Sequence, residues 1–280
     1  MTLLTNEELE ILRRKARIIR KDILEMYAVS GGGHFGGSLS VVEILTLLYG
    51  KVMRYDPRNP KWPERDRLIL SKGHTNGALC GALAEFGFFP KDLLNTFNQL
   101  DSPFGMHPDM HKIPGCDMST GSLGHGSAVA AGIALAGKAD RLDYFVYLIL
   151  GDGECQEGTV WESASVSAHY HLNNLIAFVD RNRISQEGMT EEVNRLEPFA
   201  DRWRSFGWNV QEIDGHDFEQ IYAGILAAQQ SKEFPTVLIA HTIKGRGVSF
   251  MENTYKYHYA DLTSDELELA RSELDVEGGE

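Results

Sequence analysis

Residues 144–185 read YFVYLILGDGECQEGTVWESASVSAHYHLNNLIAFVDRNRIS. The first seven of them, 144–150, are apolar or aromatic, which is typical of a strand that is buried on both faces. A helical run is expected to follow to about His171, and a second apolar strand is expected over 175–179. Two strands joined by a helix form a βαβ unit with parallel strands. The stretch therefore predicts an α/β fold.

Polar residues follow both predicted strands at their carboxyl ends. Asp152 lies between Gly151 and Gly153, and Asn182 follows the second strand. Open α/β sheets bind ligands at this edge, so both side chains should face one crevice. Glycines let a phosphate approach the backbone, and Mg²⁺ prefers carboxylate, amide and carbonyl oxygens together with phosphates. The pattern predicts a site for magnesium and a diphosphate, and a tight turn with a capping aspartate is the simpler alternative.

The rest of the chain alternates between predicted helices and strands. Thr5 and Glu8 fit a capping box, and apolar residues then recur at helical spacing. The alternation predicts a doubly wound, mostly parallel sheet with helices on both faces. We expect a single domain over 1–280, in which 244–280 form a loop and a short acidic helix. Further strands are expected over 67–70, 208–213 and 236–241, and helices over 6–29, 40–49, 127–136 and 218–230.

Composition and charge exclude several classes of protein. The chain has 27 basic and 40 acidic residues and a net charge of −13, which argues against a nucleic-acid partner. No apolar run approaches the roughly 18 residues of a membrane span, and the amino-terminal residues include acids, unlike a targeting peptide. Cys80, Cys116 and Cys155 show no spacing typical of a zinc site or a disulfide framework. We expect a soluble, cytoplasmic protein without a membrane partner.

Several separate motifs resemble one family. GDG followed about thirty residues later by Asn182 resembles the signature of thiamine-diphosphate enzymes, and GDGECQEG resembles transketolase. GGGHFGGSLS, SKGHTNG, FGMHP and STGSLGHG also resemble transketolase motifs. The likeness covers nearly the whole chain and points to the amino-terminal, diphosphate-binding part of that enzyme. It implies the thiamine-diphosphate-binding fold of that part.

The resemblance implies a set of cofactor and metal ligands. Asp152, Asn182 and the backbone carbonyl of Ile184 would bind Mg²⁺, and Asn182 would also contact the cofactor. Gly153 and His74 would flank the diphosphate of thiamine diphosphate, although a helix-capping role is the alternative for His74. Backbone groups of two further residues would meet the aminopyrimidine ring, namely Gly121 and Leu123.

Three histidines would act on the sugar. By resemblance His34, His107 and His258 contact sugar hydroxyls and shuttle protons, a task suited to a side chain that titrates near neutrality. His34 stands in a glycine-rich turn where it could be incidental. His258 is flanked by Tyr257 and Tyr259 where the family has Trp and Gly, and a loop histidine without a role is the alternative there.

The mechanism that the resemblance implies needs a second chain. In the family, a glutamate of a pyrimidine-binding domain activates the cofactor, and arginines of that domain hold the sugar phosphate. We expect a companion subunit to supply both, with Glu157 facing it, in a heterotetramer. The pair would transfer a two-carbon ketol unit from a ketose phosphate to an aldose. The alternatives are a subunit like 1-deoxyxylulose-5-phosphate synthase or the alpha chain of a 2-oxo acid dehydrogenase, and a non-catalytic regulatory module that binds the diphosphate.

Overall fold

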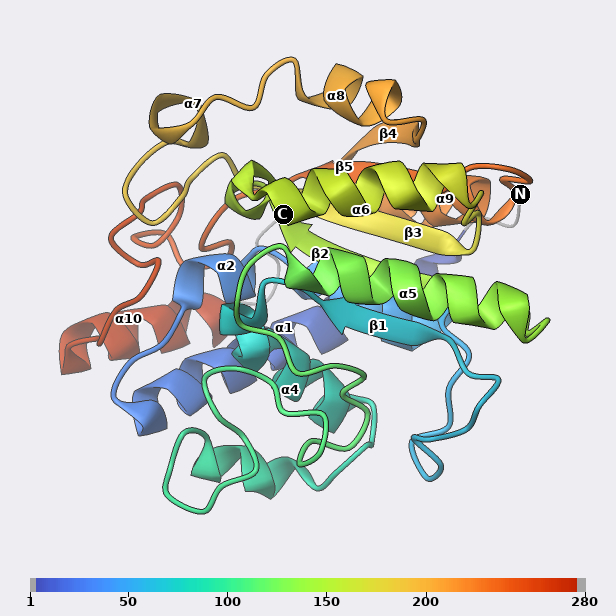
Figure 1. The fold of residues 1–280 in the computed structure, drawn as a ribbon. Helices are drawn as coiled ribbons and strands as arrows, with labels where there is room; N and C mark the ends of the chain where they lie inside the picture. The colour runs from blue at the N-terminus through green and yellow to red at the C-terminus, as the bar shows by residue number, and fades with distance from the viewer. Residues whose placement is uncertain (1–3, 276–280) are drawn as a thin grey trace.

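The computed structural model describes residues 4–275, and five strands in this range form one sheet (Figure 1). The strand order is β1-β2-β3-β5-β4, and every neighbouring pair is parallel. The carboxyl ends of all five strands therefore lie along the same edge of the sheet. The strands are β1 Arg67–Leu70, β2 Val146–Gly151, β3 Leu175–Arg181, β4 Asn209–Asp214 and β5 Thr236–His241.

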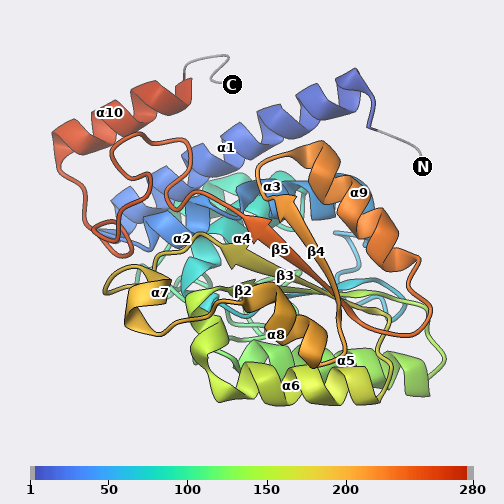
Figure 2. The same ribbon diagram turned by 90° about the horizontal axis from the view of Figure 1, so that it is seen from above.

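Helices cover both faces of the sheet (Figure 2). One face carries α1 Asn6–Ser30, α3 Val42–Leu47, α4 Asn76–Glu85 and α9 Phe218–Gln229. The other carries α5 His125–Ala139, α6 Gly158–His169 and α8 Phe199–Ser205. The predicted doubly wound α/β fold is confirmed.

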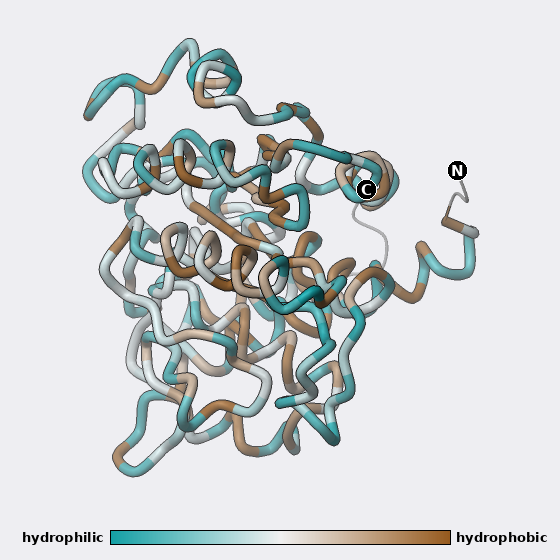
Figure 3. The backbone as a smooth tube through the Cα atoms, turned by 45° about the vertical axis from the view of Figure 1, so that its right-hand side comes forward, coloured by the Kyte–Doolittle hydropathy of each residue, from teal (hydrophilic) through white to brown (hydrophobic). Residues whose placement is uncertain are grey.

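Alternate residues of the central strands supply two separate cores. Tyr147 and Ile149 of β2 pack with the helices of the first face, whereas Leu148 and Leu150 pack with those of the second. Such strands are buried on both faces and read as continuous apolar runs, which is why the sequence reveals them. Figure 3 shows hydrophobic segments running through the interior and hydrophilic ones mainly in the peripheral loops.

Helix α1 follows the predicted pattern closely. The hydroxyl of Thr5 accepts a hydrogen bond from the Glu8 amide at 3.2 Å, and the Glu8 carboxylate accepts one from the Thr5 amide at 2.8 Å. This reciprocal pair is the predicted capping box. The helix ends at Gly31, whose φ of 70° is left-handed and favours glycine.

The stretch 35–52 differs from the prediction in two respects. A helix was expected to begin at Ser40, but α2 Phe35–Leu39 already lies before that residue, and α3 and a π-helical turn over Leu48–Val52 follow it. By length and composition this stretch could cross a membrane, contrary to the expectation that no apolar run approaches that length. It is 83% buried within the protein, however, as a core element of a globular fold would be.

Other boundaries also differ from the predicted ones. The helix expected directly after Asp152 begins at Gly158, because a 3₁₀ turn over Gly153–Gln156 comes first. The small-residue helix begins at His125, two residues before the expected start. Four short elements were not predicted, namely the 3₁₀ turns Gly73–Thr75 and Lys91–Thr96 and the helices α7 Thr190–Val193 and α8.

The predicted acidic helix near the carboxyl end is α10, Ser264–Asp275, which lies beside α1 in Figure 2. Arg271 forms an ion pair with Glu25 at 2.6 Å, and Lys21 forms one with Asp275. The remainder of the predicted carboxyl-terminal segment, 276–280, lies outside the described residues.

Two glycines of α5 provide a test of how closely this helix packs. A Cβ added at Gly126 would lie 2.4 Å from Ser71 Oγ and 2.7 Å from Ser71 Cα, whereas one added at Gly132 would meet nothing within 4 Å. Gly126→Ala should lower the free energy of unfolding by about 1 to 3 kcal/mol through overpacking. Gly132→Ala should raise it by about 0.5 to 1 kcal/mol through helix propensity. Urea unfolding of the two variants measures both, and equal effects would contradict the close contact between α5 and the end of β1.

Candidate active site

The predicted site residues come together at the carboxyl edge of the sheet. His74 follows β1, Asp152 follows β2 and Asn182 follows β3. His34 precedes α2, and His258 lies on the segment after β5. The parallel sheet places these five positions in one region although they span most of the chain.

Asp152 is buried, with 2% of its surface exposed, rather than lying in an open crevice. One carboxylate oxygen accepts from the Gly153 amide at 2.7 Å. The other accepts from the Arg183 amide at 2.6 Å and from the Arg181 guanidinium at 3.2 Å. Burial and the neighbouring carboxylate of Asp180 raise the pKa of Asp152 to about 6. A cation at this carboxylate would reverse that shift.

Asn182 and Ile184 lie next to one another beyond β3. The Asn182 amide group donates to Asp180 Oδ2 at 2.9 Å, and its oxygen accepts from the Ile184 amide at 3.1 Å. The ammonium of Lys244 donates to the carbonyls of Ile184 at 2.7 Å and Ser185 at 3.0 Å. The Ile184 carbonyl therefore already faces a positive charge, as a metal-binding carbonyl would.

The Asp180 carboxylate accepts hydrogen bonds from four different residues at the carboxyl edge of the sheet. The carboxylate is fully buried and accepts from Lys72 Nζ at 2.5 Å, from Ser40 Oγ at 2.7 Å and from the Thr242 hydroxyl, in addition to Asn182. Burial alone would raise the pKa of Asp180, but the charge and hydrogen bonds of Lys72 lower it below its usual value. Through Lys72 and Thr242, the Asp180 carboxylate joins the ends of β1, β3 and β5.

The four predicted histidines form one cluster. The ring centroid of His34 lies 5.0 Å from that of His74, 5.5 Å from that of His258 and 6.4 Å from that of His107. The rings of His74 and His258 stack at 5.3 Å. Tyr259, for which the sequence predicted no role, packs edge-on against His34 at 5.0 Å.

These histidines are neutral at physiological pH. Burial lowers the pKa of His34 to about 4, and the neighbouring His107 and the Lys244 ammonium lower it as well, because protonation of His34 beside them is disfavoured. Burial and Lys244 lower that of His258 to about 3, and burial also lowers the pKa values of His74 and His107. His258 Nδ1 accepts from Lys244 Nζ at 3.0 Å, which requires an unprotonated nitrogen.

The predicted aminopyrimidine contacts lie on the loop before α5. A Cβ added at Gly121 would lie 3.4 Å from the His107 ring, so this backbone borders the histidine cluster. Leu123 is partly exposed, and Glu154 fixes the next residue by accepting from the Gly124 amide at 2.7 Å. Glu154 also accepts from Ser71 Oγ at 2.5 Å and from the Gly151 amide at 3.0 Å. One buried carboxylate thus ties three turns of the site together.

Several observations fit a polar ligand at this edge. Among the described residues, His34 Nδ1 and Ser185 Oγ are buried without a hydrogen-bond partner, and such groups are costly unless a ligand or water satisfies them. A Cβ at Gly153 would lie 3.2 Å from Ser185 Oγ. Within the same range there is no group of three or more His, Cys, Asp or Glu side chains placed to hold a metal ion. The predicted magnesium ligands, in contrast, are one carboxylate, one amide and one carbonyl.

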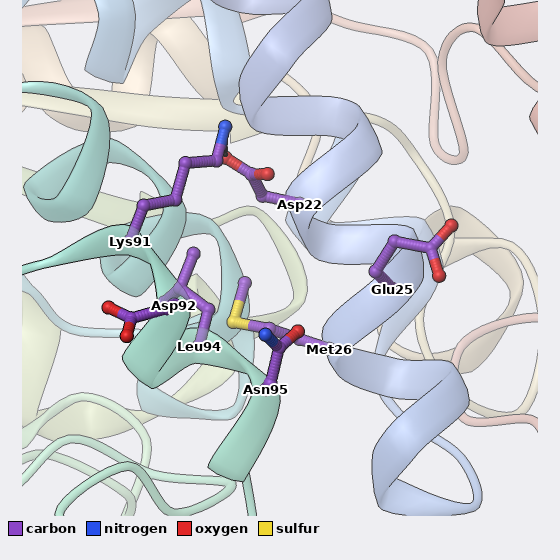
Figure 4. A pocket seen from close by; sticks show the side chains of 7 residues that line it. All are labelled: Asp22, Glu25, Met26, Lys91, Asp92, Leu94 and Asn95. Carbon is purple, nitrogen blue, oxygen red and sulfur yellow. Dashed lines mark ion pairs between the residues drawn. The ribbon is translucent and has the colours of Figure 1, made fainter.

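A shallow cavity elsewhere in the protein contains none of these groups. It lies between α1 and the 3₁₀ turn over 91–96, has a volume of about 200 Å³ and contains the ion pair of Lys91 with Asp22 at 2.9 Å (Figure 4). The described residues that line it include no histidine or cysteine, and its Lys91 side chain is 48% exposed. The residues that line it are Asp22, Glu25, Met26, Lys91, Asp92, Leu94 and Asn95.

Sequence reasoning missed five buried charged residues of the site. Lys72 and Glu154 stand within the motifs SKGHTNG and GDGECQEG, and Asp180 and Arg181 directly follow the predicted strand over 175–179. Lys244 opens the segment over 244–280 that was predicted as a loop and a short acidic helix. The available signal was their position directly after predicted strands, where ligands of open α/β sheets are found.

The neutral histidines give the protein a defined pH dependence. His258 has a pKa of about 3 when folded and near 6.5 when unfolded, so between these values the unfolded chain binds more protons. Its contribution to stability is complete above about pH 6.5 and is lost as the pH falls toward 3. From pH 7.5 to 5.0, His258→Asn should therefore lose up to about 2 kcal/mol less of its free energy of unfolding than the unmodified protein.

Urea unfolding at the two pH values measures this difference. The comparison is made between variants because the raised pKa of Asp152 acts in the opposite direction. Exposed His111 provides the control, because His111→Asn removes a histidine that is not buried. Equal pH dependence in His258→Asn and the unmodified chain would contradict the neutral, buried state of His258.

Comparison with known proteins identifies the family. Residues 11–279 match the transketolase thiamine diphosphate binding domain. The chain is 46% identical over 267 residues to the 6-deoxy-6-sulfo-D-fructose transketolase subunit of Clostridium sp. (strain MSTE9), covering 95% of this chain and 97% of that one. It is 40% identical to an apulose-4-phosphate transketolase subunit of Phocaeicola vulgatus, covering 95% of each.

Solved structures agree with these relatives. Transketolase from Campylobacter jejuni superposes with a TM-score of 0.89 at 31% identity, and the match covers 95% of this chain but 43% of that one. The chain therefore spans less than half the length of that transketolase chain. The resemblance to transketolase that the motifs predicted is confirmed, and so is the fold. The chain belongs to the transketolase family and corresponds to its thiamine diphosphate binding domain.

Proposed function

We propose that this chain is the cofactor-binding subunit of a two-subunit transketolase that moves a two-carbon ketol unit from a ketose phosphate to an aldose. The observation that carries the proposal is the packing of His74, His107 and His258 around His34, at the sheet edge that also presents Asp152. A module that only bound a diphosphate would not need four clustered histidines. Relatives that are named as transketolase subunits support the same conclusion.

Asp152, Asn182 and the carbonyl of Ile184 would hold Mg²⁺ in this proposal. Oxygen ligands of these types suit magnesium. The Ile184 carbonyl accepts a hydrogen bond from the Lys244 ammonium at 2.7 Å, so Lys244 would have to move away from this oxygen when the metal binds. His74, Gly153 and the backbone of Gly121 and Leu123 would contact thiamine diphosphate. The cofactor supplies, when bound, the carbanion chemistry that breaks and forms the carbon–carbon bond of the ketose.

The sugar-facing histidines would work as neutral imidazoles. Because burial lowers their pKa values, His34, His107 and His258 are uncharged at neutral pH and can accept hydrogen bonds from sugar hydroxyls. The lowered pKa values make them weaker bases than the sequence analysis expected of a side chain that titrates near neutrality. His34 Nδ1 has no hydrogen-bond partner among the described residues, so it is available to a hydroxyl group of the substrate. Lys244, with a pKa that burial lowers to about 8, would keep His258 oriented through its hydrogen bond.

A second subunit would complete the site. The first 13 residues of α5 carry no Asp, Glu, Lys or Arg, and Ala128, Gly132 and Leu135 are exposed on it. This uncharged helix begins next to Leu123, and exposed Glu157 lies close by, since a Cβ at Gly124 would be 3.0 Å from its Cβ. Such a surface beside the proposed cofactor site fits a partner. We propose a pyrimidine-binding transketolase subunit, in a heterotetramer of two pairs.

The proposed substrates are sugar phosphates, and the proposed compartment is the cytoplasm. Two relatives are named for 6-deoxy-6-sulfo-D-fructose and for apulose 4-phosphate, which are ketoses with an anionic group. Free, buried thiols at Cys80, Cys116 and Cys155 fit a reducing compartment.

Asp152→Asn tests the metal site. The substitution keeps the shape of the buried side chain. It removes the negative charge of the one carboxylate among the three proposed Mg²⁺ ligands. We expect it to abolish magnesium-dependent binding of thiamine diphosphate, measured by calorimetric titration with and without Mg²⁺. Exposed Asp140→Asn should bind as the unmodified chain does. Unchanged affinity in Asp152→Asn would refute the metal assignment.

Activity tests the proposed assembly. The chain alone, assayed with Mg²⁺, thiamine diphosphate, a ketose phosphate and an aldose phosphate, should show no transfer, because the glutamate that activates the aminopyrimidine and the groups that hold the sugar phosphate would lie on another subunit. Addition of a purified pyrimidine-domain subunit should restore transfer. Full activity of the chain alone would overturn the proposal, and so would the absence of transfer with a verified partner across several ketose donors.

A further inference from the structure

Arg181 makes a set of contacts that the proposed reaction does not use. Its side chain is 1% exposed, and its guanidinium touches carboxylates on two sides. On one side it donates to Asp152 Oδ2 at 3.2 Å. On the other it donates at 2.9 Å to Glu191 Oε1 and at 2.9 Å to Glu197 Oε1. Arg181 thus joins the proposed metal ligand to the loop formed by residues 186–198, called here the 186–198 loop.

The 186–198 loop owes much of its shape to the same two glutamates. Glu191 accepts from the amides of Leu196 and Glu197 at 3.2 Å each, and Glu197 accepts from the Phe199 amide at 2.8 Å. Their side chains are 36% and 45% exposed, whereas Arg181 and Asp152 are buried. The glutamates reach Arg181 only while this loop keeps its fold. A second bond, from Gln156 to the Asn194 carbonyl at 2.7 Å, holds the loop near the GDG turn.

The number of carboxylates around Arg181 decides whether the Asp152 carboxylate pairs with Arg181 or stays available to a metal ion. Three carboxylates share one guanidinium, and the contact to Asp152 is the longest of the three ion pairs. Two loop glutamates already balance the buried positive charge, so Asp152 is not its principal partner. Without them Asp152 would be the remaining carboxylate for a buried guanidinium, and a buried charge that loses its partners is strongly disfavoured. The ion pair of Arg181 with Asp152 would then become shorter, and the affinity of Asp152 for a metal ion would fall.

We infer that Glu191 and Glu197 are positioning residues that hold the Arg181 guanidinium and so keep the Asp152 carboxylate available to Mg²⁺, although the two glutamates do not contact the proposed metal ligands. The inference rests on the proposed metal site and adds to it a link between that site and the 186–198 loop. Groups that orient metal ligands in this way commonly change metal affinity by about 10- to 100-fold when they are altered.

The test measures Mg²⁺ affinity by calorimetry at saturating thiamine diphosphate, with the chain assembled with its partner subunit. The double variant Glu191→Gln and Glu197→Gln should bind Mg²⁺ at least about tenfold more weakly than the unmodified chain. Glu192→Gln is the matched control, because it removes an exposed charge from the same helix, α7, and should stay within about twofold.

The double glutamine change is also made in an Arg181→Met protein. This comparison separates an effect that acts through Arg181 from the long-range effect of removing two negative charges. In Arg181→Met the double glutamine change should cost nothing further, since there is no guanidinium left to turn toward Asp152. The inference would be overturned if the double glutamine change also weakened Mg²⁺ binding in Arg181→Met. It would also be overturned if the change weakened binding no more than Glu192→Gln does, because either result would reflect only the removal of negative charge. If circular dichroism shows that Arg181→Met does not fold, Arg181→Gln replaces it, since a neutral amide cannot form an ion pair with Asp152.

The outcomes for the inference and for the proposed function are distinct. Failure of the unmodified assembly to bind Mg²⁺ with thiamine diphosphate would refute the proposed function, and the inference with it. Normal binding by the unmodified chain together with unchanged affinity in the double glutamine variant would refute the inference alone.

Discussion

The structure depends on the buried carboxylate of Asp180. It receives hydrogen bonds from Lys72 after β1, Thr242 after β5 and Ser40 between two helices, and it orients the amide of Asn182. A charge this deep in the protein is tolerated only when it is paired and fully hydrogen-bonded, and here both conditions are met. Because the carboxylate fixes the Asn182 amide nitrogen, the amide oxygen is directed away from it. The geometry of the proposed metal site thus follows from an ion pair that contacts no metal.

Electrostatic balance distinguishes the two buried lysines. Lys72 forms a buried ion pair with Asp180, so its positive charge is balanced within the protein. Lys244 donates to two carbonyls and to His258, all of which are neutral, and burial lowers its pKa to about 8. A cluster of neutral imidazoles around one such ammonium leaves a positive charge that favours an anionic ligand. The histidines supply hydrogen bonds, and the lysine supplies charge.

The sheet could be predicted from the sequence, because parallel strands buried on both faces leave continuous apolar runs. Arg67–Leu70 and Thr236–His241 were located at their observed boundaries for this reason. The family could be predicted because several separate motifs resemble those of transketolase. The histidines could be found because each stands in a glycine-rich turn or a recognisable loop motif. Asp180, Arg181 and Lys244 could not, because a charged residue is ordinarily read as exposed, and its burial depends on partners far away in the chain. Asp180 and Lys72, for example, are separated by 108 positions. The start of α2 was missed because its glycines are poor helix formers and tertiary packing overrides that preference.

The strand order has a consequence for how the protein is made. β4 lies at the edge of the sheet and pairs only with β5, which is synthesised later and inserts between β3 and β4. A growing chain must therefore keep residues 209–214 unpaired until residues 236–241 have left the ribosome. Thr242 and Lys244 follow directly, so Asp180 and Ile184 gain these partners in the same event. Non-local pairing of this kind is slow to form. Nascent chains should thus pass through a state in which the proposed cofactor site still lacks Thr242 and Lys244 as partners.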